Sequence, residues 1–106
     1  MDRDKLLKKI DSFNDELINI RRHIHAHPEL SGLENQTAIL ISGYLKNIGW
    51  RVTESVGGTG VVADFGPKDK DFIGLRVDMD ALPIYENTNL SFSSKIDGVM
   101  HACGHD

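Results

Sequence analysis

The sequence predicts an α/β fold in which two amphipathic helices precede three short strands. Apolar residues recur every three or four positions in the first half of the chain. Beyond residue 50 this pattern gives way to short apolar runs, and glycine-rich turns separate those runs. The chain of 106 residues is long enough for one domain at most.

The first helix is predicted from about residue 4 to residue 27. Pro28 ends it because the residue before a proline avoids helical backbone angles. The second helix is predicted after Ser31 and Glu34, which have the spacing of a capping box. It ends at Gly49, since glycine is the residue most typical of helix C-termini. The apolar face of the first helix comprises Leu6, Leu7, Ile10, Phe13, Leu17, Ile20 and Ile24.

Strands are predicted at residues 51–56, 61–65 and 72–77, with polar or glycine-rich turns between them. The third strand is almost continuously apolar, which is typical of a strand covered on both faces. A short chain has few elements to provide that cover, so we expect an exposed sheet edge and exposed apolar surface if the segment exists alone. Residues 84–99 lack periodicity and are predicted to form a long loop, a type of loop that often carries function.

Composition excludes several classes of function. The net charge is -4 and the basic residues form no long run, so we expect no nucleic-acid partner. No apolar stretch has the length of a membrane span, so we expect no membrane partner. A single cysteine rules out an internal disulfide bond. These features together favour a cytoplasmic location.

The last six residues, 101–106, place two histidines, a cysteine and an aspartate around one glycine. Imidazole and thiolate ligands suit zinc and other late first-row divalent ions. Cys103 and His105 can face one ion, and His101 and Asp106 are candidates for further ligands or for partners of the ligands. The alternative is a frayed tail that merely contains these residue types. Because a metal site needs three or four protein ligands, we expect these residues to form only half of one.

Asp78 and Asp80 directly follow the third predicted strand. Alternation along an extended chain points both carboxylates to the same side. Near a metal they would either ligate it or orient a ligand histidine. The alternative is a solvated turn with helix-capping aspartates.

Three alternate histidines, His23, His25 and His27, precede Pro28. Residues two apart do not share a helix face. For His23 and His27 the pattern therefore favours a role at the helix C-terminus, where histidine suits the negative end of the helix dipole.

Several motifs resemble the M20 metallopeptidase family. Residues 76–83 are similar to the RADMDALP signature of its aminoacylase/amidohydrolase branch, with Val77 in place of the alanine, and residues 98–106 are similar to the GxMHACGHD signature. This branch includes hippurate hydrolases and indole-acetyl-amino-acid hydrolases. Further matching positions are Arg21, Arg22, His25, Pro28, Glu29, Leu30, Glu34, Thr37 and residues 60–63.

The resemblance implies that residues 1–106 are the N-terminal part of a zinc-aminopeptidase-like catalytic domain. Cys103 and His105 would be metal ligands, and Asp80 would be the supporting acid beside the site. Asp78 stands where related enzymes have a histidine ligand, so it is a further candidate ligand. The implied cofactors are divalent ions (zinc, manganese, cobalt or nickel), two per site. The implied reaction is hydrolysis of the amide bond of an N-acyl amino acid or a similar small, peptide-like conjugate.

In the family, the general-base glutamate, further histidine ligands and an inserted dimerisation domain follow the CGHD motif. We therefore expect a fragment that is inactive alone and a full-length form that is a homo-oligomer. Two alternatives stay open. One is a truncated, non-catalytic binding or regulatory product of such a gene, and the other is an independent thiol-based redox or metal-carrier protein.

Overall fold

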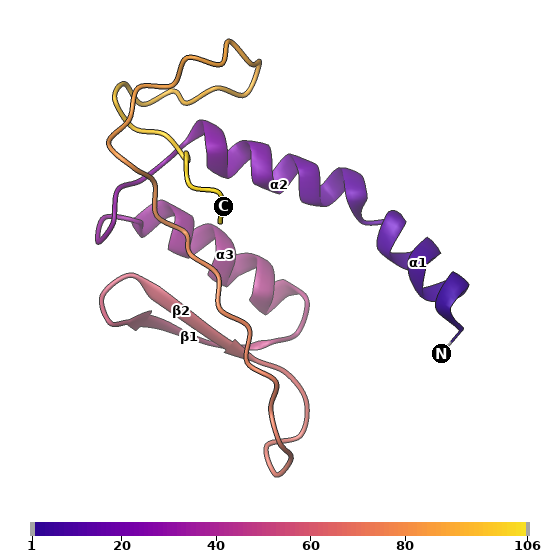
Figure 1. Ribbon diagram of the computed structural model, residues 1–106. Helices are drawn as coiled ribbons and strands as arrows, with labels where there is room; N and C mark the ends of the chain where they lie inside the picture. The colour runs from indigo at the N-terminus through magenta and orange to yellow at the C-terminus, as the bar shows by residue number, and fades with distance from the viewer. Residues whose placement is uncertain (1, 106) are drawn as a thin grey trace.

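The computed structural model describes residues 2–105. Three helices, α1 (Arg3–Asp11), α2 (Asn14–Ala26) and α3 (Asn35–Asn47), precede an antiparallel hairpin of β1 (Arg51–Val56) and β2 (Gly60–Asp64). Helix α3 packs against both strands. Figure 1 shows α2 on the other side of α3, with α1 continuing away from it. The predicted α/β class is confirmed.

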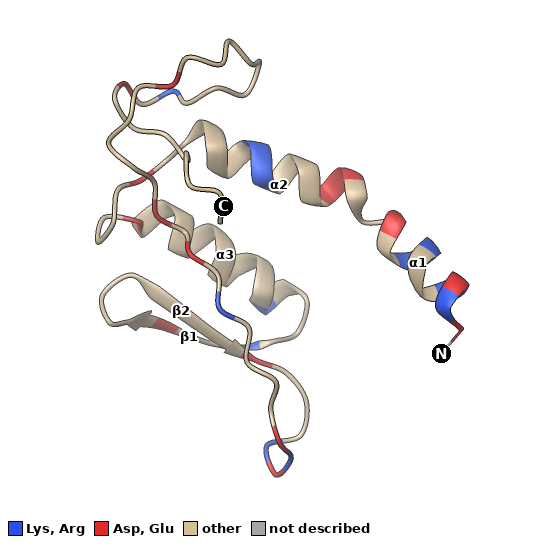
Figure 2. Ribbon diagram, in the orientation of Figure 1, with Lys and Arg blue, Asp and Glu red and all other residues tan. Residues whose placement is uncertain are grey.

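The single helix predicted over residues 4–27 is wrong, because it is interrupted at residues 12–13 and forms two helices, α1 and α2. The Ser12 hydroxyl donates to the carbonyl of Lys9 at 2.6 Å, and the Phe13 N–H bonds to the carbonyl of Ile10. Short polar side chains compete with the helix for backbone hydrogen bonds, and apolar spacing does not register this competition. Helix α1 buries no residue. Charges of both signs are interspersed along it (Figure 2).

The predicted capping box at the start of α3 is also wrong. The N-cap residue is Glu34, whose side chain makes no capping hydrogen bond. Its carboxylate instead accepts a hydrogen bond from the Thr59 hydroxyl in the hairpin turn, at 2.5 Å. The carboxylate of Glu29 caps the helix from the preceding turn by accepting from the N–H groups of Gln36 and Thr37 at 3.1 and 2.6 Å.

The end of α3 is as predicted. Gly49 follows the helix with a φ of 89°. Its N–H donates to the carbonyl of Lys46, and the N–H of Trp50 donates to that of Leu45, each at 3.0 Å. This pair of bonds is the Schellman motif, which satisfies carbonyls left open at a helix end.

The first two predicted strands form the hairpin. Arg51 pairs with Asp64 at its open end, and Val56 pairs with Gly60 beside the turn. The side chains of Arg51 and Asp64 also form an ion pair. The register is irregular between Thr53 and Val56, where Ser55 has a φ of 58°. Such an irregularity bends a strand locally.

The predicted third strand is not a strand in the structure. Residues 72–77 are extended but pair with no strand among residues 2–105. Ile73 is 100% exposed and Leu75 is 91% exposed, so the expected exposed apolar surface is confirmed. The apolar run indicates side chains suited to a covered strand, but a strand forms only where a neighbour supplies hydrogen bonds.

The segment after residue 80 returns to the helices. The N–H of Ala81 donates to the carbonyl of Glu29 at 2.8 Å, and two backbone hydrogen bonds join Leu82 to Met100. As predicted, residues 84–99 contain no helix or strand. Two of the buried residues, Glu34 and Ser42, bond to Thr59 and Glu54 of the hairpin. The other buried residues are His25, Ala26, Thr37, Ala81 and His101. None of the helices in residues 2–105 has the length and apolarity needed to cross a membrane.

Candidate metal centre

Cys103 and His105 lie together beyond the Leu82–Met100 bridge. The Sγ atom of Cys103 is 3.4 Å from Nδ1 of His105, and both residues are exposed. A thiolate and an imidazole bound to one tetrahedral zinc ion, at about 2.3 and 2.1 Å, are ~3.5 Å apart. The separation therefore fits two neighbouring corners of a metal site.

The described residues do not complete such a site. Over residues 2–105, no group of three or more histidine, cysteine, aspartate or glutamate side chains is arranged to hold an ion. Asp106, a candidate from the sequence, lies outside the described residues. The pair of Cys103 and His105 thus supplies two ligands, whereas a metal site has three or four.

A cavity of about 470 Å³ lies beside this pair and has a largely apolar wall. Helices α2 and α3, the extended segment at residues 77–79 and the terminal motif all contribute to it. A water-poor wall next to a metal strengthens electrostatic interactions at the ion and accommodates an apolar ligand group. The lining residues are Leu17, Ile20, Arg21, Ile24, His25, Ile41, Val77, Asp78, Met79, His101, Cys103 and Gly104.

The two aspartates of the extended segment have different surroundings. Asp78 lines the same cavity as Cys103, and its carboxylate accepts a hydrogen bond from the Arg76 guanidinium at 3.1 Å. The structure does not bring Asp78 into one ligand group with Cys103 and His105. Asp80 is half-buried, directly before the Ala81 N–H that bonds to Glu29.

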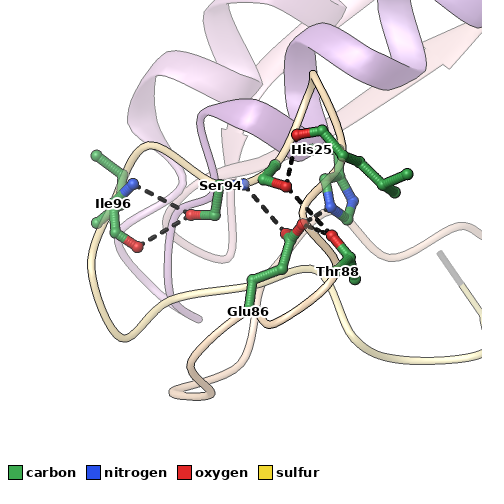
Figure 3. A network of polar contacts seen from close by, with 7 residues as sticks. His25, Glu86, Thr88, Ser94 and Ile96 are labelled. Carbon is green, nitrogen blue, oxygen red and sulfur yellow. Dashed lines mark hydrogen bonds and ion pairs between the residues drawn. The ribbon is translucent and has the colours of Figure 1, made fainter.

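One residue that lines this cavity, His25, is hydrogen-bonded to a buried carboxylate, that of Glu86 (Figure 3). Nε2 of His25, near the end of α2, is 2.7 Å from Oε1 of Glu86 in the long loop. Glu86 also accepts hydrogen bonds from the Ser94 N–H and the Thr88 hydroxyl. Burial raises the pKa of Glu86, but the hydrogen bonds from Thr88, Ser94 and His25 outweigh it and lower that pKa to about 2. The carboxylate is therefore ionised at neutral pH.

The sequence gives no local signal for Glu86, because it lies in a segment without periodicity and its partner is 61 residues away. His25 does belong to a matched motif. Its ring packs edge-on against Phe92 at 5.7 Å and lies 6.4 Å from the ring of His101. Arg22 covers the same Phe92 ring at 4.7 Å. Arg22 and His25, both in the matched motif near the end of α2, thus pack against residues of the long loop.

Comparison with known proteins finds similar sequences and a similar fold. Residues 74–106 match the sequence profile of peptidase family M20/M25/M40. The hippurate hydrolase of Campylobacter jejuni is 50% identical over 103 residues, which are 95% of this chain and 27% of that protein. The N-acetylcysteine deacetylase of Bacillus subtilis is 47% identical over 97 residues, which are 90% of this chain and 26% of that protein.

A solved structure shows the same arrangement of elements. The YXEP protein of Bacillus subtilis, described as a dinuclear metal binding peptidase from the M20 family, has a TM-score of 0.81 and 46% sequence identity with this chain. The match covers 90% of this chain and 27% of that one.

The fold is of the α/β class and is structurally similar to M20 peptidase domains. Residues 74–106 match the M20 family profile and 90% of the chain aligns with a solved M20 peptidase, so the resemblance seen in the two signature motifs is confirmed. It spans about a quarter of the length of the curated relatives it matches.

Proposed function

We propose that residues 1–106 form the N-terminal portion of the catalytic domain of a metal-dependent amidohydrolase. The proposed reaction is hydrolysis of the amide bond of N-acyl amino acids or similar small conjugates. The observation that carries the proposal is the 3.4 Å separation of Cys103 Sγ and His105 Nδ1 beside an apolar cavity. Relatives that are named as a hippurate hydrolase and an N-acetylcysteine deacetylase support the reaction class.

In this proposal Cys103 and His105 hold a divalent ion. Asp80 is the supporting acid, and Asp78 is a further candidate ligand that would have to leave Arg76. Zinc, manganese, cobalt and nickel all accept such ligands. Two ions per site are proposed, and the description of the YXEP protein as dinuclear supports this number. When bound, such ions lower the pKa of a water molecule and polarise the scissile carbonyl.

The other residues of the chain position this site. The Leu82–Met100 bridge fixes the segment that carries Cys103 relative to the segment that carries the two aspartates. The His25–Glu86 pair holds the intervening loop against α2. The apolar side chains of α2 that line the cavity offer a surface for the apolar part of a small substrate.

We expect residues 1–106 to be inactive alone, because the general-base glutamate and the remaining ligands belong to the rest of the family's catalytic domain. The full-length form is proposed to be a homo-oligomer. A thiolate ligand at Cys103 favours a reducing compartment, so the proposed location is the cytoplasm.

Two measurements test the ligand assignment. Titration of the chain with Co²⁺ should produce thiolate-to-metal charge-transfer absorption, which Cys103→Ala should abolish and His105→Ala should weaken. In the full-length protein, either substitution should remove hydrolysis with the fold retained, because each removes a metal ligand. Asp97→Ala, at an exposed position before the motif, is the control and should keep normal turnover. Unchanged turnover in both ligand variants would refute the assignment.

The reading frame beyond codon 106 separates the enzyme from a truncated, non-catalytic product. An open frame that encodes another histidine within a few residues, and later a pair of glutamates, supports the amidohydrolase. A stop codon at that point favours the truncated product.

A further inference from the structure

A second pair of potential metal ligands lies at the end of α2. His23 is in the last turn of the helix and His27 is its C-cap residue. Residues four apart share one side of a helix. Their ring centres are 4.5 Å apart, with the planes tilted by 33°, and both residues are exposed. Neither lines the cavity beside Cys103, so this pair is separate from the candidate centre.

One hydrogen bond fixes the tautomer of His27. Its Nδ1 atom is 2.8 Å from the backbone carbonyl oxygen of His23. A carbonyl only accepts, so Nδ1 must carry the hydrogen, and the lone pair of the neutral ring is on Nε2. Metal-bound histidines characteristically donate their other ring N–H in this way, which orients the ligand and raises its basicity. The contact also agrees with the helix-terminus role predicted from the sequence.

The spacing of the rings fits a shared ion. Two imidazoles that each place a nitrogen about 2.1 Å from one ion have ring centres ~5 Å apart. The observed separation is close to this value, so small side-chain rotations suffice. The two rings border a small cavity of about 40 Å³, and its other lining residues carry no charge that would repel a cation: Ile24, Gln36, Thr37 and Leu40.

We propose that His23 and His27 together bind a late first-row divalent cation such as Ni²⁺, Zn²⁺ or Cu²⁺. Imidazole is a preferred ligand of these ions, and histidines at positions i and i+4 are the spacing by which a helix presents two ligands to zinc. With two protein ligands, water completes the coordination. The bound ion bridges the last turn of α2 and stabilises it.

The test uses the 106-residue chain with Cys103→Ala and His105→Ala, which removes the candidate centre as a competing site. Ni²⁺ is the probe, and calorimetry measures its affinity. We expect one ion per chain. His23→Gln and His27→Gln should each weaken binding at least ~10-fold, because each removes one of two ligands. This outcome does not depend on the proposed hydrolase activity.

A matched control keeps the number of histidines and changes only their spacing. In Asn19→His/His23→Asn, the exposed position 19 lies on the same helix face as position 23, but two turns (~12 Å) from His27. This variant should lose Ni²⁺ affinity as fully as the single variants. Circular dichroism confirms that each variant keeps the helix content of its parent.

Thermal unfolding gives a second readout. Saturating Ni²⁺ should raise the melting temperature of the parent by ~5 °C, since ligand binding to the folded state stabilises it. The rise should be absent in the spacing control. Equal Ni²⁺ affinity in the parent and the spacing control, or in the parent and both single variants, overturns the proposal.

Discussion

Nε2 of His25 donates a hydrogen bond to Oε1 of Glu86 at 2.7 Å, and this contact joins the end of α2 to a loop that has no regular structure. A backbone hydrogen bond is a second contact between the helix and the loop: the N–H of Lys95 donates to the carbonyl of Ala26 at 2.9 Å. The loop is thus held at two points against one helix end. The segment that carries Cys103 and His105 follows directly from the loop, so its position depends on these contacts.

Glu86 should make stability depend on pH in the acid range. Its pKa in the folded chain is about 2, below the ordinary value of 4.5. As pH falls from 4.5, the unfolded chain takes up a proton that the folded chain does not. The stability contributed by Glu86 is therefore complete above pH 4.5 and is lost as the pH falls towards 2. Urea unfolding followed by circular dichroism at a series of pH values should show this decline.

Glu86→Gln isolates the contribution of this carboxylate from that of others, such as Glu29. The variant keeps the shape of the side chain but loses its charge, so we expect it to cost about 1–3 kcal/mol at pH 7. Its stability should also fall less steeply than that of the parent between pH 4.5 and 2. If the stability of the parent and of Glu86→Gln falls equally steeply with pH, then another group causes the loss of stability in acid.

Glu29 should act as the cap of α3, although it lies outside the helix. Its carboxylate accepts hydrogen bonds from the Thr37 hydroxyl and from two backbone N–H groups of the first turn. Burial raises the pKa of Glu29, but the hydrogen bonds from Thr37 and Gln36 outweigh it and leave the pKa lowered. Glu29→Ala should cost about 1–2 kcal/mol in the free energy of unfolding, the usual effect of removing a helix cap. Urea denaturation at pH 7 measures it.

Ser31→Ala is the matched control. A capping box would make Ser31 the important residue, whereas in the structure the helix begins four residues later and Glu29 satisfies its first N–H groups. We expect a change of less than about 0.5 kcal/mol. If Ser31→Ala proves more damaging than Glu29→Ala, then the sequence pattern describes this helix start correctly and the structure does not.

Sequence patterns predicted those parts of the fold that depend on neighbouring residues. The end of α3 requires only a positive φ at one residue, Gly49, and glycine is the residue that adopts it most readily. The cap from Glu29 and the failure of residues 72–77 to pair depend on where distant segments lie. Ser12 interrupts the first helix through one side-chain bond, which apolar periodicity cannot register.

In the candidate site too, contacts between neighbouring residues could be predicted from the sequence and contacts between distant residues could not. Cys103 and His105 are separated by one glycine, so their proximity follows from the sequence itself. Glu86 could not be found, because nothing in its own segment indicates that the loop returns to His25. The role of the cysteine and histidine as ligands stays a prediction from the family signature.

Two glycines, one inside α3 and one just after its end, should respond to alanine with opposite signs of the change in stability. Gly49 has a φ of 89°, and a Cβ atom there would meet nothing within 4 Å. The cost of Gly49→Ala is therefore purely that of the left-handed backbone, about 1–2 kcal/mol. Gly43 lies inside the helix and also has free space around it. Gly43→Ala should gain about 0.5–1 kcal/mol because alanine loses less backbone freedom on folding. Thermal melts of both variants, run beside the parent, test the contrast, and equal signs would contradict it.

The exposed segment at residues 72–77 should control self-association of this chain more than its stability. Ile73 and Leu75 expose nearly all of their side chains, and Figure 1 draws the chain between β2 and the long loop without helix or strand. Replacing both by serine removes no buried contact, so the free energy of unfolding should change by less than about 0.5 kcal/mol. An extended apolar segment with open backbone groups invites pairing with another chain, so the same change should reduce association. Sedimentation velocity over a range of concentrations measures this effect.

The paired control for this segment replaces Lys68 and Lys70, two exposed residues of the preceding turn, by serine. It adds the same side chains without removing apolar surface, so association should stay at the level of the parent. If the Ile73→Ser/Leu75→Ser variant associates as strongly as the parent, other exposed apolar residues drive the process. A loss of stability in that variant, well above 0.5 kcal/mol, would mean instead that the segment is packed in solution, and the unpaired arrangement of residues 72–77 would then be wrong.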